Sequence, residues 1–372
     1  MSKKALPVSL QGLRVGLYPY GAAGNPYQRL ISTALTAEGF APVPLPKQNW
    51  FALRWASRQP IDLLQMYWPH SLYHGRNFAA ATLKRLMFTE GLRCLDRIPF
   101  LYTVDNLFPH DSNDEAFEKR MIQRLIDRAD GFLVMARASG EVFRQNYNLP
   151  SGAEIYPVPI SNYINVYPNE INQTESRRRL NLPASARVAV FFGRLSWYKG
   201  LDKLIPAFLS LDAPETVLLL AGQPEDPTLV PILQQLTNEL GGPRSGQVRV
   251  DARFIPDADV QLYLNAADFS VLPFADMPMS PSSVVLSMGF GKPVISPAKA
   301  ATPEIVGDTL FGYDDRDVNG LANALQRAFA ATDLAERGRE VYARACANHS
   351  RERLGAAFRD AYERLAGRLQ AK

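Results

Sequence analysis

The sequence predicts an α/β protein built from two domains, each with a doubly wound parallel sheet. At 372 residues, 47% of them hydrophobic, the chain exceeds the size at which a single core stops growing. Short apolar runs alternate with helix-length amphipathic stretches, the pattern of parallel strands covered by helices on both faces. This alternation occurs twice, on either side of a stretch rich in proline and asparagine. Two sheets are therefore expected.

The first domain is expected over residues 1–160 and the second over residues 186–345. A linker is expected over 161–185, where the apolar pattern is interrupted, and a closing helix over 346–372. The strands of the first domain are expected at 13–18, 41–45, 62–68, 99–104 and 131–135. Those of the second are expected at 187–193, 216–222, 248–250, 269–274 and 293–296. Each domain is then Rossmann-like, and an acceptor is expected between the two.

Composition and charge restrict the class of protein. The net charge of +4 and the pI near 9.0 permit attraction to anionic lipid or to phosphate-bearing substrates. No basic run with interleaved aromatics occurs, so nucleic acid is not an expected partner. Cys94 and Cys346 lie far apart and without metal-ligand spacing, which argues against a disulfide framework or a zinc site. With no apolar stretch of roughly 18 to 20 residues, a cytoplasmic protein is expected.

An anion site is predicted where the apolar run at 187–192 ends. The segment GRLSWYKG, residues 193–200, precedes an amphipathic helix and carries Arg194 and Lys199 between glycines. Backbone N–H groups and the helix dipole favour negative charge at such a place, and the two cations add the fixed charge that a leaving diphosphate needs. The alternative is that both are ordinary solvated loop charges.

This GR-x4-KG pattern resembles the donor-phosphate loop of the GT-B glycosyltransferases of the family-4 type, the glycosyl transferases group 1. In that family the arginine and the lysine contact the donor diphosphate. The resemblance continues over 271–312, where GKPV at 291–294 and PEIV at 303–306 match. It implies a helix that meets the distal phosphate with the N–H groups of its first residues. These residues are Ser282, Ser283 and Val284.

The chain departs from the family at its Glu-x7-Glu pair, because Met279 and Ser287 occupy the two glutamate positions. In the family the first glutamate touches the donor sugar and the second the ribose, so the donor sugar and the stereochemistry stay open. Asp276 is a candidate replacement, and a loop-turn role is the alternative. The resemblance also assigns a set of residues to the nucleoside. They are Phe254, Ile255, Gly222 and Ser287.

The strongest catalytic candidates lie in TVDNLFPHDSND, residues 103–114, which begins at the end of a buried strand. In similar glycosyltransferases a T-V-H-N or T-V-H-D segment holds a histidine beside the donor sugar and acceptor, and here Asp105 takes its place. An aspartate there could deprotonate an acceptor hydroxyl as a general base, which suits inversion. His110 is the second candidate, and a structural hydrogen-bonding role is open for both.

Two further loops of the first domain follow expected strands. Gly21 and Gly24, with Asn25, form a turn that lets the donor sugar approach the backbone, although glycines in such turns often serve geometry alone. The segment at 67–77 offers aromatic and polar side chains that suit an acceptor sugar, or that pack on the following helix. These are Trp68, His70, Tyr73 and His74. The two histidines lack a third ligand, so no metal is expected.

Together these features predict a metal-independent hexosyltransferase that needs no cofactor and takes its sugar from a UDP- or GDP-sugar donor. The expected acceptor is a saccharide or a lipid-linked saccharide, as in bacterial envelope or exopolysaccharide synthesis. A non-catalytic relative that binds sugar nucleotides or polysaccharides is one alternative. A GT-B epimerase or phosphorylase is another.

A basic segment of the first domain suits a peripheral contact with the inner face of a membrane. It combines cations with apolar residues, and an ordinary solvated helix face is the commoner explanation. The cations are Lys84, Arg85, Arg93 and Arg97, and the apolar residues are Leu83, Met87 and Phe88.

Overall fold

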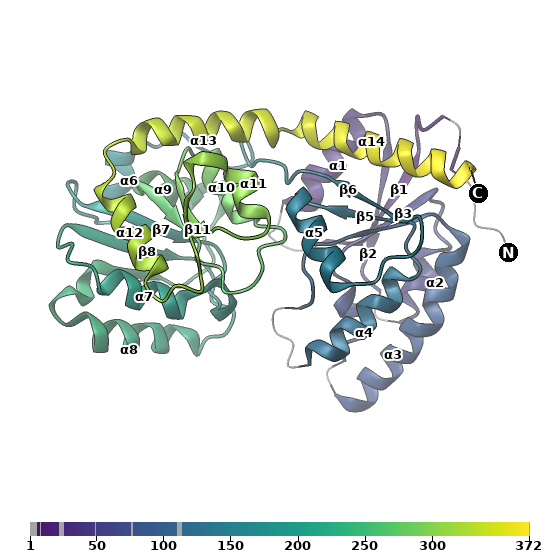
Figure 1. Ribbon diagram of the computed structural model, residues 1–372, viewed down its shortest axis with the longest axis horizontal. Coiled ribbons are helices and arrows are strands. Elements are labelled where there is room, and N and C mark those ends of the chain that lie inside the picture. The colour runs from purple at the N-terminus through teal and green to yellow at the C-terminus, as the bar shows by residue number, and fades with distance from the viewer. Residues whose placement is uncertain are drawn as a thin grey trace. The chain divides into compact units, whose positions relative to one another are not determined.

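The chain forms two compact units, shown in Figure 1. The structure, a computed structural model, describes residues 6–7, 9–21, 26–48, 50–75, 77–109 and 114–371. Unit 1 comprises Met1–Ser161 with Ser350–Lys372, and unit 2 comprises Asn162–His349. No helix in the described part of the chain has the length and apolarity to cross a membrane.

Unit 1 is a six-stranded parallel sheet with helices on its two faces, in the order β2-β1-β3-β4-β5-β6. Its strands are β1 (Arg14–Tyr20), β2 (Ala41–Pro46), β3 (Leu63–Met66), β4 (Phe100–Thr103), β5 (Gly131–Val134) and β6 (Glu154–Pro157). Its helices are α1 (Tyr27–Ala37), α2 (Ala52–Ala56), α3 (Phe78–Leu92), α4 (Glu115–Ile126), α5 (Arg137–Asn146) and α14 (Arg351–Gln370). The strand order reverses at β1, so the loops after β1 and β3 flank the place where such sheets bind ligands.

Unit 2 repeats this architecture with the order β12-β11-β10-β7-β8-β9, again parallel. Its strands are β7 (Arg187–Phe192), β8 (Thr216–Ala221), β9 (Val248–Asp251), β10 (Phe269–Val271), β11 (Val294–Pro297) and β12 (Phe311–Tyr313). Its helices are α6 (Gln173–Arg179), α7 (Leu201–Leu209), α8 (Leu229–Gly241), α9 (Val260–Ala266), α10 (Ser282–Gly289), α11 (Ala301–Val306), α12 (Gly320–Ala330) and α13 (Leu334–Asn348). The order reverses between β7 and β10, which makes their following loops the expected ligand edge.

The expected closing helix over 346–372 corresponds to α14, while residues 346–348 are the end of α13. Two helices occupy this region: α13 completes unit 2, and α14 returns to unit 1, where it packs against α1. Tyr362 of α14 is fully buried and its hydroxyl donates to Oε1 of Gln65 on β3 at 2.7 Å. Arg359 forms an ion pair with Glu38 at 2.6 Å. These contacts fix the position of α14 on unit 1.

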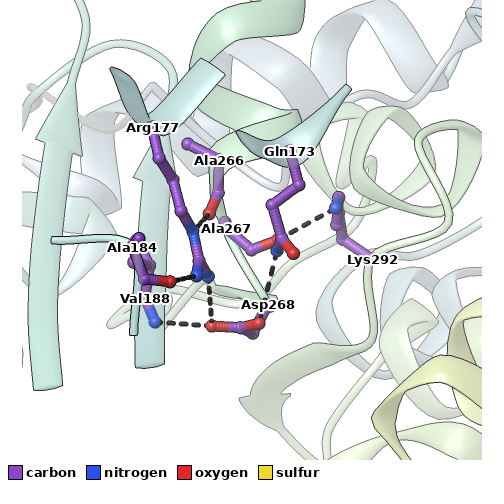
Figure 2. A network of polar contacts seen from close by, with 8 residues as sticks. All are labelled: Gln173, Arg177, Ala184, Val188, Ala266, Ala267, Asp268 and Lys292. Carbon is purple, nitrogen blue, oxygen red and sulfur yellow. Dashed lines mark hydrogen bonds and ion pairs between the residues drawn. The ribbon is translucent and has the colours of Figure 1, made fainter. Parts of the chain in front are cut away.

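The expected linker over 161–185 contains helix α6, which packs against α9 within unit 2. Arg177 of α6 is buried, and Figure 2 shows its guanidinium among three acceptors. Its Nε donates to the carbonyl of Ala266 at 3.0 Å, and its Nη1 to that of Ala184 at 2.7 Å. Its Nη2 pairs with Asp268 at 3.0 Å. Because every acceptor belongs to unit 2, this part of the expected linker is an integral part of that unit.

Lys292, the lysine of the GKPV segment, belongs to the same polar network (Figure 2). Its Nζ donates to the carbonyl of Ala267 at 2.9 Å, next to Asp268. Burial lowers the pKa of this ammonium to about 8, while the charge of Asp268 opposes the shift. Lys292 therefore acts as a structural brace.

Candidate active site

The loop after β7 holds the cations of the predicted anion site, and two glycines fix its path. A Cβ on Gly222 would lie 1.9 Å from the carbonyl oxygen of Gly193, and one on Gly200 would lie 2.1 Å from that of Pro273. Both glycines also have positive φ, 147° and 76°. Only glycine permits these approaches, which bring residues 193–200 against the loops that follow β8 and β10.

Lys199 places a poorly solvated ammonium at this edge of the sheet. Its Nζ lies 5.8 Å from the ring centre of Phe191 and 5.9 Å from that of Tyr198. Burial lowers its pKa to about 8, the charge of Arg194 acts in the same direction, and Glu225 opposes them. No ion pair of Lys199 exists among the described residues. A poorly solvated cation without a carboxylate partner is costly, so an anionic ligand would stabilise it.

Arg194 is the second cation of the loop and is open to solvent. Its guanidinium Nη1 lies 3.8 Å from Oε1 of Glu225, with 61% of the arginine side chain exposed. A contact at that distance between exposed groups is weak, so a ligand can compete for the guanidinium. Glu225 follows β8, and the sequence alone gave no signal for it.

Helix α10 presents its N-terminus at the ligand edge, as the resemblance implied for Ser282, Ser283 and Val284. No side chain caps this terminus, whose N-cap residue is Pro281. The N–H groups of Ser282 and Val284 already donate to the carbonyls of Ser280 and Pro281, at 2.9 and 3.0 Å, so a phosphate would have to compete with these bonds. The hydroxyl of Tyr163 forms a hydrogen bond with Ser282, which ties the helix start to the chain segment before α6.

The two positions that carry glutamates in the family are buried. Met279 is 1% exposed and Ser287 is 2% exposed. The Ser287 hydroxyl donates to the carbonyl of Ser283 at 2.9 Å. Of the residues assigned to the nucleoside, Ile255 lies in the hydrophobic core of unit 2, whereas Phe254 is 57% exposed. Phe254 is therefore the one of this pair whose side chain can meet a ligand.

In unit 1, Asp105 lines a pocket at the end of β4. The pocket is small, with about 20 Å³ of room, enough for roughly one water molecule, and Trp68, His70 and Asn106 also line it. Burial raises the pKa of the Asp105 carboxyl to about 7, and a hydrogen bond with the Tyr27 hydroxyl partly offsets this. Its Oδ2 is buried and has no hydrogen-bond partner in the described part of the chain. The carboxylate is thus poised to take a proton near neutral pH.

Trp68 forms one wall of this pocket in an unusual backbone conformation. Its φ is 42°, the left-handed region that bulky side chains rarely adopt. The ring packs 6.3 Å from Tyr27 and 5.8 Å from Tyr67, centre to centre. Outliers of this kind concentrate at functional sites. The conformation turns the chain after β3 so that the indole lines the pocket.

Tyr73 and His74, both assigned to the acceptor, converge on one buried carboxylate. The Tyr73 hydroxyl donates to Oε2 of Glu118 at 2.7 Å, and Nε2 of His74 lies 2.7 Å from Oε1. Tyr73 is fully buried and Glu118 is 1% exposed, while the His74 side chain is 47% exposed. This trio fixes the loop after β3 onto α4. Sequence reasoning missed Glu118, because its helix reads as an ordinary amphipathic one.

The loop after β1 is held from within by Gln28, which is 3% exposed. Its Nε2 donates to the carbonyl of Pro19 at 2.6 Å, and its Oε1 accepts from the N–H of Gly21 at 3.0 Å. Gly24, Asn25 and His110 lie outside the described residues. Within the described ranges no three His, Cys, Asp or Glu side chains are grouped to hold a metal ion.

The family model for glycosyl transferases group 1 matches residues 186–331, which hold the cationic loop and α10. The match lies entirely within unit 2. A Bacillus subtilis protein named as teichuronic acid biosynthesis glycosyltransferase TuaC is 31% identical to the chain over 205 residues, 54% of this chain and 46% of that protein. The D-inositol 3-phosphate glycosyltransferase of Corynebacterium glutamicum is 27% identical over 253 residues, 63% and 59% of the two chains. The chain thus spans about half the length of the curated relatives it matches.

Solved structures confirm the predicted GT-B fold of the chain. Sucrose-phosphate synthase from Thermosynechococcus elongatus superposes with a TM-score of 0.72 over 95% of this chain and 99% of that chain, at 19% identity. Anabaena Alr3699/HepE, solved with UDP and glucose, gives 0.74 over the same shares at 18% identity. At these identities the likeness shows the fold alone.

Proposed function

We propose that the chain is a glycosyltransferase that moves a sugar from a nucleotide-diphosphate donor to a saccharide or lipid-linked saccharide. The observation that carries this proposal is the partly buried, poorly solvated ammonium of Lys199. It lies beside the guanidinium of Arg194, in a glycine-bounded loop at the ligand edge of the region that the group 1 family model matches. Two neighbouring cations, of which Arg194 meets the carboxylate of Glu225 only at 3.8 Å, suit a diphosphate.

The cationic loop would act chiefly on the leaving group. When the bond between the sugar and the diphosphate breaks, negative charge develops on the phosphate oxygen. Lys199, still mostly protonated at pH 7 with its pKa near 8, and Arg194 would neutralise that charge. The N–H groups at the start of α10 would add to this. With this much fixed positive charge we propose a transfer that needs no metal ion.

Asp105 of unit 1 would act on the acceptor. Its carboxylate takes the proton of the acceptor hydroxyl while the hydroxyl oxygen forms its bond to the anomeric carbon. A pKa near 7 leaves much of the group ionised at neutral pH and keeps it basic enough to hold the proton. A direct displacement of this kind inverts the anomeric carbon, and inversion is what we propose.

A UDP-sugar is the donor to test first, because the fold relative Alr3699/HepE is solved with UDP-glucose. GDP-sugars are the second choice. The TuaC relative carries a name from cell-envelope polysaccharide synthesis, which supports a role in making envelope or exopolysaccharide. A lipid-linked acceptor in such synthesis would place the protein in the cytoplasm, at the inner face of the membrane.

The test is nucleotide release from UDP- and GDP-sugars by the full chain, with and without saccharide acceptors. We expect release that Arg194→Ala abolishes. Arg249→Ala is the matched control, because this arginine of unit 2 is exposed on β9 and has no ion pair among the described residues.

The buried Met279 and Ser287 favour one rival, a relative that binds sugar nucleotides without turnover. Donor binding with no nucleotide release under any acceptor would establish that rival and end the proposal. Conversion of the donor to an epimer without acceptor would instead identify an epimerase.

A further inference from the structure

Exposed apolar side chains of unit 1 concentrate on two neighbouring helices. Within the described part of this unit, all five exposed large hydrophobic residues lie in or beside α2 and α3. They are Trp50 (50% exposed), Phe51 (59%), Phe78 (85%), Leu83 (47%) and Leu86 (61%). We call this set the α2–α3 surface. Because the five share two packed helices, this pair of helices is the candidate interaction surface of unit 1.

Helices α2 and α3 pack together, and part of α3 is buried in unit 1. Helix α2 meets the C-terminal end of α3, where a Cβ on Gly91 would lie 3.0 Å from that of Leu53. Phe88 and Leu92 are buried, at 2% and 4% exposure. The sequence-based membrane segment is thus corrected, since Phe88 belongs to the core. Leu83 and Leu86 remain exposed in the described part of unit 1.

The same stretch of chain carries the positive charge of the whole protein. From Lys47 to Arg97 there are eight Lys and Arg residues and three Asp and Glu residues, a surplus of five. The whole chain has a net charge of +4, so the rest of it is close to neutral. The exposed cations of this stretch without an ion pair among the described residues are Lys47, Arg54, Arg58 and Arg97.

We infer that the α2–α3 surface docks on an anionic lipid bilayer. This inference rests on the proposed function in one respect: the reason for docking would be access to a lipid-linked acceptor. Apolar side chains flanked by cations bind the headgroup region through buried apolar area and attraction to anionic lipid. The aromatic rings of Trp50 and Phe51 suit that depth. A second copy of the chain is a poorer occupant, because a symmetric contact would bring two surpluses of positive charge together.

The experiment is sedimentation of the full chain with vesicles of phosphatidylcholine, with and without phosphatidylglycerol. We expect binding that needs the anionic lipid and weakens with added salt. Leu83→Ser with Leu86→Ser should weaken it about tenfold. Arg54→Gln with Arg58→Gln should weaken it roughly 30-fold, from the attraction of each basic residue to such a surface. Val318→Ser is the control, a 93% exposed residue of unit 2 that should change nothing.

Equal binding to both vesicle types, absence of binding, or variants that bind like the wild type would each overturn the inference. So would self-association that the Leu83 and Leu86 changes abolish, since it would assign the surface to a second copy. Transfer to a water-soluble acceptor is measured on the same variants. Loss of vesicle binding with intact transfer supports the docking surface, whereas nucleotide release that fails in all proteins counts against the proposed function alone.

Discussion

The two units each carry a poorly solvated charged group at the carboxyl edge of the sheet, but the charges have opposite signs. In unit 1 the carboxyl of Asp105 has no ion pair among the described residues, and burial raises its pKa to about 7. In unit 2 the ammonium of Lys199 has no ion-paired carboxylate among the described residues, and burial lowers its pKa to about 8. Desolvation moves both groups toward their neutral forms near physiological pH.

The opposite charges of Asp105 and Lys199 suit two different chemical roles. A carboxyl with a pKa near neutrality suits a group that must accept a proton as the carboxylate and release it later. A cation without an ion-paired carboxylate suits a group that binds an anionic ligand. Under the proposed function, one fold used twice would supply a base in unit 1 and an anion site in unit 2. The predictions below test whether each group has the role that its sign implies.

The largest effect is expected for Asp105→Asn, which keeps the shape of the side chain and removes its basicity. Transfer to acceptor should fall by about 10² to 10⁴-fold, the usual contribution of a positioned base. Binding of the nucleotide donor should stay unchanged, because Asp105 lies in unit 1. Steady-state transfer and donor titration measure the two. Unchanged turnover would eliminate Asp105 as the base.

Lys199→Met is expected to have the next largest effect. It removes charge from the leaving-group site, so transfer should fall by about 10² to 10³-fold, as for loss of one oxyanion donor. Lys203→Met is the matched control: this exposed lysine lies four residues on, in α7, and its loss should leave the rate within twofold. Equal losses in both variants would argue for a general charge effect.

The pH profile of kcat/KM should be a narrow bell, because the two groups must be in opposite protonation states. Below pH 7 Asp105 becomes protonated and the rate falls, and above pH 8 Lys199 loses its proton and the rate falls again. Lys199→Arg should remove the alkaline limb, since arginine stays charged. A profile that is flat between pH 6 and pH 9 would exclude both assignments.

Sequence reasoning reached the features that depend on continuous apolar runs. Strands such as β8, TVLLLA, are buried on both faces, so they are visible as unbroken apolar segments, and the loop with Arg194 and Lys199 follows directly from the end of β7. It could not find α6, because QTESRRR has no apolar stripe. That helix is held by the buried guanidinium of Arg177, whose acceptors are mostly remote in the sequence.

The side-chain partners within the candidate site likewise could not be predicted from the sequence. Glu118 and Gln28 sit on helices that look ordinary, and only the fold brings them to the loops after β3 and β1. Ile255 was assigned to the nucleoside beside Phe254, but adjacent residues of an irregular segment point different ways, and Ile255 is in the core. Burial at single positions of a loop has no signal in local composition.

The smallest expected effect is on stability. The pKa of Asp105 is higher in the folded than in the unfolded state. Ionisation of its carboxyl therefore destabilises the fold, and the free energy of unfolding falls as pH rises from about 4 through 7. Asp105→Asn should therefore raise the free energy of unfolding by roughly 1 to 3 kcal/mol at pH 8. At pH 4 the advantage should vanish. Melting curves at the two pH values check this, and a destabilised variant at pH 8 would contradict it.

The most direct test of the central claim, a diphosphate site built on Lys199, is calorimetric titration of UDP and GDP into the full chain between pH 7 and pH 9. The wild type should bind one of them, with affinity that falls as pH rises through about 8, whereas Lys199→Met should bind weakly and without that pH dependence. The same affinity and the same pH dependence in both proteins would contradict the account.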